Sequence, residues 1–217
     1  MSEGVVRATV EEMIVSLRDL DDVGSRRESD GTLRIRKGSP RRDGLFTDAY
    51  LHTIYAGLRP AGVTQIEEMI GKPLPRELAA FYLQANGLSI FSGSMSIGGL
   101  RTNYSRDPSI LLPVSVEYGN TLDVPLRVDG GYDGLDQCVR FGFYADEEGY
   151  ELMMRNDGDP YVYLLPRFRT GPVLHTWGSF SNFLRSETER FVREYVKIDG
   201  KIDALNVLPP PHLASGA

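Results

Sequence analysis

Histidine and cysteine are the side chains best suited to act as nucleophiles, bases or metal ligands, and this sequence has few of them. The three histidines, His52, His175 and His212, are far apart, and none lies at i, i+4 from another ligand. Cys138 is the single cysteine, so no internal disulfide or cysteine-based metal cage forms. We interpret it as a buried, inert thiol in a strand. A Cys138–His175 nucleophile pair has residue type alone in its favour, and we predict no catalytic residue, no cofactor and no metal ion.

The glycine-rich stretch 93–99 is the nearest approach to a nucleotide-binding or hydrolase motif. It lacks the lysine of a phosphate-binding loop and the spacing of a dinucleotide fold. Ser94 occupies the first glycine position of a serine elbow, so that motif is also missing. We interpret the stretch as a tight turn between two strands, and we expect a protein that is not an enzyme.

Carboxylates gather in short segments in the middle of the chain. Residues 101–165 carry twelve acidic and five basic side chains, against a net charge of −6 for the whole chain. Their spacing does not fit a calcium loop, and adjacent exposed acids titrate normally. An acidic surface repels nucleic acid and attracts basic proteins, the alternative being a face kept acidic for solubility. The positions predicted to contact a partner are Asp133, Asp136, Asp146, Glu147, Glu148, Asp157 and Asp159.

Apolar residues at helical spacing predict the helices that would position these segments. Thr9 with Glu12, and Thr64 with Glu67, have the spacing of capping boxes. Ser179 predicts the start of a final helix. The expected helices span 10–21, 45–58, 64 to a stop at Gly71, 75 to a stop at Asn86-Gly87, and a last one after Ser179.

Short runs of β-branched and aromatic residues, separated by turn residues, predict strands from residue 88 onward. Because sequential strands joined by short turns pair antiparallel, we predict an α+β single domain with a mostly antiparallel central sheet flanked by helices. The expected strands are 88–91, 95–100, 110–116, 122–128, 137–144, 150–155 and 161–165.

The remaining segments are interpreted as connectors. Residues 21–44 look like loop, with Leu33 and Ile35 in a short edge strand, and the proline-rich end is expected to be poorly ordered or laid along the surface. No apolar run of about 18 residues is present, and Glu11 and Glu12 interrupt the first apolar stretch. We therefore expect a cytoplasmic protein with no membrane contact.

One ordered set of motifs resembles the SUKH superfamily, which includes the yeast Smi/Knr cell-wall-synthesis regulators and many bacterial immunity proteins. Order and spacing, rather than any single motif, carry the resemblance, which covers about 60–197. Leu88 departs from it, because the family often has a further glycine after Asn-Gly. The motifs are Gly62-Val-Thr-Gln-Ile-Glu67, Gly71-Lys-Pro-Leu-Pro75, Phe81, Asn86-Gly87, Phe141-Gly-Phe-Tyr-Ala-Asp-Glu-Glu-Gly149-Tyr-Glu-Leu, Pro160-Tyr-Val-Tyr163 and Trp177-Gly-Ser-Phe-Ser-Asn-Phe-Leu184.

The resemblance implies a SUKH-like domain over 60–199, preceded by an extension at 1–59 with an arginine-rich connector and followed by a tail at 200–217. It implies no catalytic residues. The function it favours is an immunity protein that binds and neutralises a basic toxin domain, such as a nuclease, through an acidic face. The alternative is a regulatory or scaffolding protein of the Smi/Knr type with an endogenous protein partner. Its pattern residues are expected to form core: Leu74, Phe81, Phe141, Phe143, Trp177, Phe180 and Phe183.

Overall fold

The computed structural model describes residues 2–20, 25–37, 50–102, 112–116, 137–145, 149–166, 172–200, 202 and 207–211. These ranges hold four helices and one antiparallel sheet of nine strands, in which each strand pairs with the next along the chain. The α+β class and the mostly antiparallel sheet predicted from the sequence are confirmed. The elements are α1 Ser2–Asp19, β1 Arg26–Arg27, β2 Leu33–Lys37, β3 Tyr50–Ala56, α2 Pro60–Ile70, α3 Arg76–Gln84, β4 Ala85–Ile90, β5 Met95–Ile97, β6 Cys138–Tyr144, β7 Tyr150–Arg155, β8 Val162–Pro166, β9 His175–Trp177 and α4 Phe180–Lys197.

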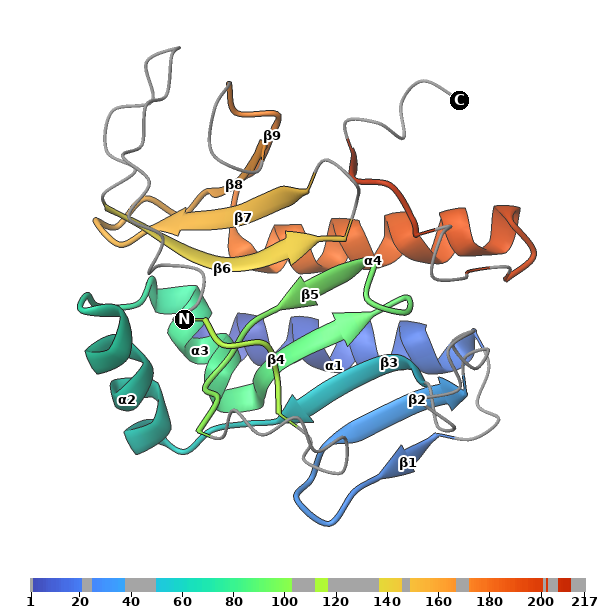
Figure 1. The fold of residues 1–217 in the computed structure, drawn as a ribbon, viewed down its shortest axis with the longest axis horizontal. Helices are drawn as coiled ribbons and strands as arrows, with labels where there is room; N and C mark the ends of the chain where they lie inside the picture. The colour runs from blue at the N-terminus through green and yellow to red at the C-terminus, as the bar shows by residue number, and fades with distance from the viewer. Residues whose placement is uncertain are drawn as a thin grey trace.

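Helices cover one face of the sheet. Helices α1 and α4 run side by side behind the strands in Figure 1, and α3 packs against α1, with α2 beside α3. Glu12 of α1 forms an ion pair with Arg185 of α4 at 3.0 Å. None of the helices in the described ranges has the length and apolarity needed to cross a lipid bilayer.

The core between the two layers is rich in aromatic rings. Phe180 of α4 lies 5.1 Å from Phe81 and 5.5 Å from Phe141, measured between ring centroids. Trp177 packs edge-on against Phe183 at 5.0 Å. Of the predicted core residues, Phe143 alone is only partly buried, because it lies on the opposite face of β6 from its buried neighbours.

The helix predicted over 45–58 is wrong in its described part. Residues 50–56 form β3, which pairs with β2 on one side and β4 on the other. The aromatic and β-branched residues that suggested a helical face also favour a strand, and long-range pairing decides between the two. Residues 45–49 lie outside the described residues.

Neither capping box begins a helix. Thr9 lies inside α1, where its hydroxyl donates to the carbonyl of Val5 at 3.0 Å. Thr64 likewise lies inside α2, which begins at Pro60. The Glu67 carboxylate instead accepts from the amide of Leu74 at 2.9 Å.

Two of the predicted helix boundaries are confirmed, and those of α3 differ. Gly71 ends α2 in the left-handed conformation, and Ser179 caps α4 by accepting from the amide of Asn182 at 3.0 Å. Pro75 lies just before α3 rather than in its first turn. The helix stops at Gln84, and Asn86 is already part of β4.

Five of the seven predicted strands are confirmed. Strand β7 has the expected bounds, and β4, β5, β6 and β8 lie within two or three residues of theirs. The sequence analysis missed β1 and β9, which have two and three residues. The strand predicted over 110–116 is wrong in its described part, because residues 112–116 form only an isolated parallel bridge between Ser115 and Gly99. Residues 110, 111 and 122–128 lie outside the described residues.

The two ends of the chain join the same fold. Helix α1 and strands β1 to β3 extend the sheet and its helical layer, and Leu33 and Ile35 are buried in an inner strand rather than an edge. Leu208, from the proline-rich end, belongs to the main core instead of lying on the surface.

Candidate partner-binding surface

The turn between β7 and β8 contains the two predicted partner-binding residues that the structure describes. Arg155 donates from Nε to Asp157 Oδ2 at 2.8 Å, and its Nη2 contacts the same oxygen. Asp159 Oδ1 accepts from the amide of Tyr161 at 2.9 Å, and its Oδ2 accepts from the hydroxyl of Tyr163 at 2.6 Å. Arg155 Nε also lies 3.9 Å from Asp159 Oδ2. Both carboxylates are therefore held in fixed positions.

This turn presents charge and an aromatic ring together. The hydrogen bond from Arg155 lowers the pKa of Asp157 below its ordinary value of 3.8, so this carboxylate stays ionised at neutral pH. Tyr161 is 46% exposed and its ring lies 6.3 Å from that of Tyr163. Exposed tyrosines are enriched in protein interfaces because they supply a large contact area with little entropy to lose.

Gln137, the described residue that precedes β6, contacts this turn. The amide of Asn156 donates to the carbonyl of Gln137 at 2.9 Å, so the residue that follows Asp136 lies beside the turn. Asp133 and Asp136 themselves are outside the described residues.

The acidic run 146–148 belongs to the other end of β7. Its three residues are outside the described ranges, but Ala145 and Gly149 on either side lie next to the Tyr144–Tyr150 pair of β6 and β7. At about 3.3 Å per residue, β7 separates this end from Asp157 by about 20 Å. Asp157 and the residues that flank the acidic run 146–148 therefore lie at opposite ends of β7. We call Asp157 and Asp159, together with the predicted positions Asp133 and Asp136 that precede Gln137 in the sequence, the acidic end of β7.

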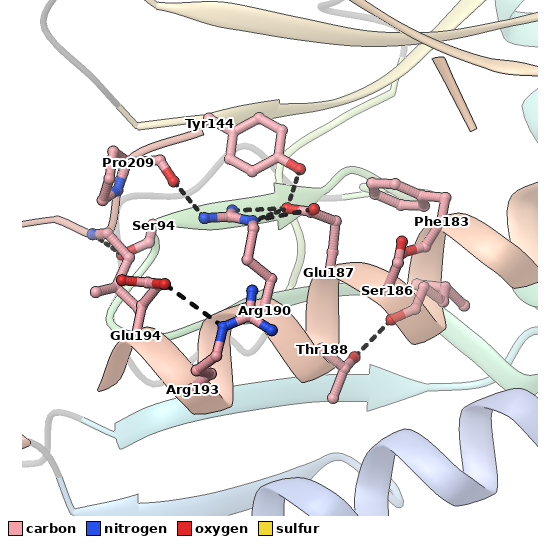
Figure 2. A network of polar contacts seen from close by, with 12 residues as sticks. Ser94, Tyr144, Phe183, Ser186, Glu187, Thr188, Arg190, Arg193, Glu194 and Pro209 are labelled. Carbon is pink, nitrogen blue, oxygen red and sulfur yellow. Dashed lines mark hydrogen bonds and ion pairs between the residues drawn. The ribbon is translucent and has the colours of Figure 1, made fainter. Parts of the chain in front are cut away.

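A second polar network is buried between the sheet and α4 (Figure 2). Tyr144 donates to Glu187 Oε2 at 2.6 Å, and Arg190 donates to the same oxygen from Nη2 at 2.7 Å. Arg190 Nε lies 3.1 Å from Glu187 Oε1. The guanidinium also stacks over the Phe191 ring at 4.3 Å. Glu187 and Arg190 are 2% and 7% exposed, so every charge here is paired away from solvent.

Burial sets the protonation of this network. Burial raises the pKa of Tyr144 well above 10.0, and the negative charge of Glu187 raises it further. Burial by itself lowers the pKa of Arg190, but the hydrogen bond and charge of Glu187 outweigh that effect and raise it overall. Tyr144 is therefore a neutral donor to a charged pair.

The sequence analysis missed this network. Glu187 occupies the buried face of α4, three and four residues after Leu184 and Phe183. A glutamate at an apolar-stripe position followed by an arginine at i+3 is the signal that could have indicated a buried pair.

A second pair, Arg140 and Glu151, joins β6 to β7, and Glu151 is buried. It lies on the same side of the sheet as the predicted thiol, Cys138, which is buried as expected. Neither Arg140 nor Glu151 was singled out from the sequence. Their adjacency comes from the hairpin register: Arg140 lies opposite Met153, so Glu151, two residues before Met153 on the same face, is its diagonal neighbour.

The histidines do not join a catalytic arrangement in the described residues. Cys138 is in β6 and His175 is in β9, and the two intervening strands place them at least about 14 Å apart at about 4.8 Å per strand. His175 packs edge-on against Trp177. His52 is buried, and its Nδ1 accepts from the amide of Phe91 at 3.2 Å. His212 lies outside the described residues.

Within the ranges that the structure describes, no three His, Cys, Asp or Glu side chains are grouped so that they could hold a metal ion. Comparison of the chain with protein-family profiles, with curated proteins and with solved structures found no match.

Proposed function

We propose that this chain is a non-enzymatic binding protein that neutralises a basic protein partner, such as a toxin domain, through the acidic end of β7. The observation that supports this proposal is the β7–β8 turn, where the carboxylates of Asp157 and Asp159 are fixed beside the exposed ring of Tyr161. Such a turn offers a binding partner both charge and apolar contact without needing to reorganise on binding.

Electrostatics favours a basic partner. The segment from 101 to 165 holds twelve acidic and five basic residues, and a surface of one sign speeds the association of partners of the opposite sign. The substrate groove of a nuclease is positively charged because it binds phosphate. Fixed carboxylates on a partner protein can bind in the same groove, because they are also negatively charged. The sequence resemblance to SUKH-type immunity proteins supports the same class of function.

The test uses tagged full-length protein to capture candidate toxins encoded near its gene, as well as partners from the native cell. Four substitutions, Asp133→Asn, Asp136→Asn, Asp157→Asn and Asp159→Asn, remove the charge of the acidic end with little change in shape. The matched control replaces Asp146 by Asn and Glu147 and Glu148 by Gln, at the other end of β7.

We expect the four-residue variant to lose at least about tenfold in affinity at low salt and the control to bind like the wild type. If only the control loses binding, the contact surface lies at the other end of β7 and the proposed site is wrong. A stable endogenous complex without any toxin would instead favour the regulatory function.

A further inference from the structure

The C-terminal segment 207–211 is held by side chains that are themselves buried. Leu208 is 4% exposed and belongs to the main core. Its amide donates to Ser94 Oγ at 2.9 Å, and Arg190 Nη1 donates to the carbonyl of Pro209 at 2.7 Å (Figure 2). The segment is thus held through one of its own apolar side chains and two of its own main-chain groups, as a bound peptide would be.

The chemistry of the segment suits binding in an extended form. Leu208 is followed by three prolines, each of which fixes its φ angle and lacks an amide hydrogen. A residue that precedes proline is also restricted to extended conformations. Such a peptide loses little entropy when it binds. Leu208 has the only amide hydrogen in 208–211, and Ser94 accepts it.

Ser94, which accepts from the Leu208 amide, lies in a turn between β4 and β5 that has an unusual backbone conformation. Phe91 and Ser92 have φ angles of 49° and 56°, in the left-handed region that non-glycine residues rarely adopt. The turn is held because Phe91 donates its amide to His52 Nδ1 and Ser92 donates its amide to the Leu51 carbonyl. Backbone strain of this kind is found where a fold presents a group for binding, and here it presents Ser94.

Arg190, which donates to the Pro209 carbonyl, is also held in a fixed position. Glu187 and Phe191 position the guanidinium of Arg190, which leaves Nη1 directed at the Pro209 carbonyl. A buried ion pair is seldom more stabilising than well-packed apolar residues of the same size. Its presence is explained if Arg190 has a recognition role in addition to its structural one.

We propose that Ser94 and Arg190 form a binding site for an extended leucine–proline peptide, which residues 207–211 occupy in cis. When the chain's own segment is displaced, the site accepts a Leu-Pro-Pro sequence from another molecule. The site lies beside the end of β6 that contains Tyr144. The amide of Ala145, the next residue, donates to the Ser94 carbonyl. The site is therefore distinct from the acidic end of β7.

The first test uses the full chain with Leu208→Asp, which makes the internal segment a poor ligand, and a labelled synthetic peptide of residues 203–217. We expect fluorescence anisotropy to show that this variant binds the peptide at least about tenfold more tightly than the wild type, whose own segment competes at high effective concentration. Adding Ser94→Ala to the Leu208→Asp variant should weaken peptide binding about fivefold. Adding Ser89→Ala, in β4, should leave peptide binding unchanged. A folded Leu208→Asp variant that does not bind the peptide would overturn the proposal.

The second test needs no variant and so remains decisive if Leu208→Asp fails to fold. Hydrogen exchange of the wild type, followed by NMR, compares the amide of Leu208 with that of Leu152 in β7. A segment that leaves its site while the domain stays folded should show protection at least about 100-fold lower at Leu208. Equal protection at both amides would mean that the segment opens only with the whole domain, and the proposal would be wrong.

Discussion

Arg190 and Arg155 each bind a carboxylate, the first inside the molecule and the second in a surface turn. Arg190 pairs with Glu187 between the sheet and α4, where their side chains are 9% and 2% exposed. Arg155 pairs with Asp157 in the β7–β8 turn, where the corresponding values are 24% and 37%. The chemistry of the two pairs is the same, and burial distinguishes them.

Burial decides what each pair can do. The buried pair was taken out of water on folding, so removing one partner leaves an uncompensated charge in the core. The surface pair keeps much of its hydration, so it contributes little to stability and its carboxylates remain accessible to another protein. We therefore expect changes at Glu187 to affect folding and changes at Asp157 to affect binding.

The largest expected effect is at Glu187. The Glu187→Ala substitution should lower the free energy of unfolding by about 3–5 kcal/mol, because Arg190 and the Tyr144 hydroxyl lose their buried partner. Urea denaturation followed by circular dichroism measures the change. Glu194→Ala, which removes a partly exposed carboxylate paired with the exposed Arg193 and Lys197 on the same helix, is the control and should have a much smaller effect. Equal losses in the two variants would contradict the distinction drawn from burial.

Tyr144→Phe sharpens the comparison by removing one hydrogen bond while leaving the ion pair. A hydrogen bond to a charged group contributes about 1.5–3 kcal/mol, so the loss should be smaller than that for Glu187→Ala. The same urea denaturation measures it. A loss as large as that of Glu187→Ala would show that the hydroxyl, and not the ion pair, dominates the network.

The pH dependence provides a further check on burial. Burial raises the pKa values of Tyr82 and Tyr144 above 10.0 in the folded protein, whereas in the unfolded chain both ionise near that value. Proton release then favours unfolding, so the stability present below pH 10 should decrease above it by about 1.4 kcal/mol per pH unit for each tyrosine. Tyr144→Phe should make this alkaline decrease less steep. An unchanged slope would mean that Tyr144 ionises in the folded state.

The smallest expected effect on stability is at Asp157. Asp157→Asn keeps the shape of the turn and removes one exposed charge, so the melting temperature should match that of the wild type within experimental error. Differential scanning fluorimetry checks this, with Glu187→Ala as the destabilised reference. A clear decrease in melting temperature would show that the turn is part of the structural framework.

Local signals in the sequence were sufficient for parts of the fold. Ser179 caps α4 through a contact only three residues away, and β7 is a short aromatic and apolar run bounded by turn residues at Gly149 and Asp157. The strand at 50–56 was mistaken for a helix because its partners, β2 and β4, lie elsewhere in the sequence. Three-residue β9 carries too little pattern to be recognised.

The candidate site, like the fold, could be predicted from the sequence only in part. The carboxylates could be named from composition, but the position of Asp157 and of the residues flanking 146–148 at opposite ends of β7 follows from the pairing of strands. The buried network joins Tyr144 to Glu187, which are 43 residues apart, so the sequence alone did not connect them. The role of Leu208 was missed because a proline-rich end is usually exposed.

The most direct test of the account is capture of candidate toxin domains by the wild type, the four-residue variant of the acidic end and the three-residue control at 146–148, all at the same two salt concentrations. Raising the salt from about 0.05 M to about 0.5 M shortens the range of electrostatic attraction severalfold. The account predicts one partner that the wild type and the control retain at low salt, that high salt releases, and that the acidic-end variant fails to capture. A partner retained equally by all three proteins would contradict the assignment of binding to the acidic end of β7.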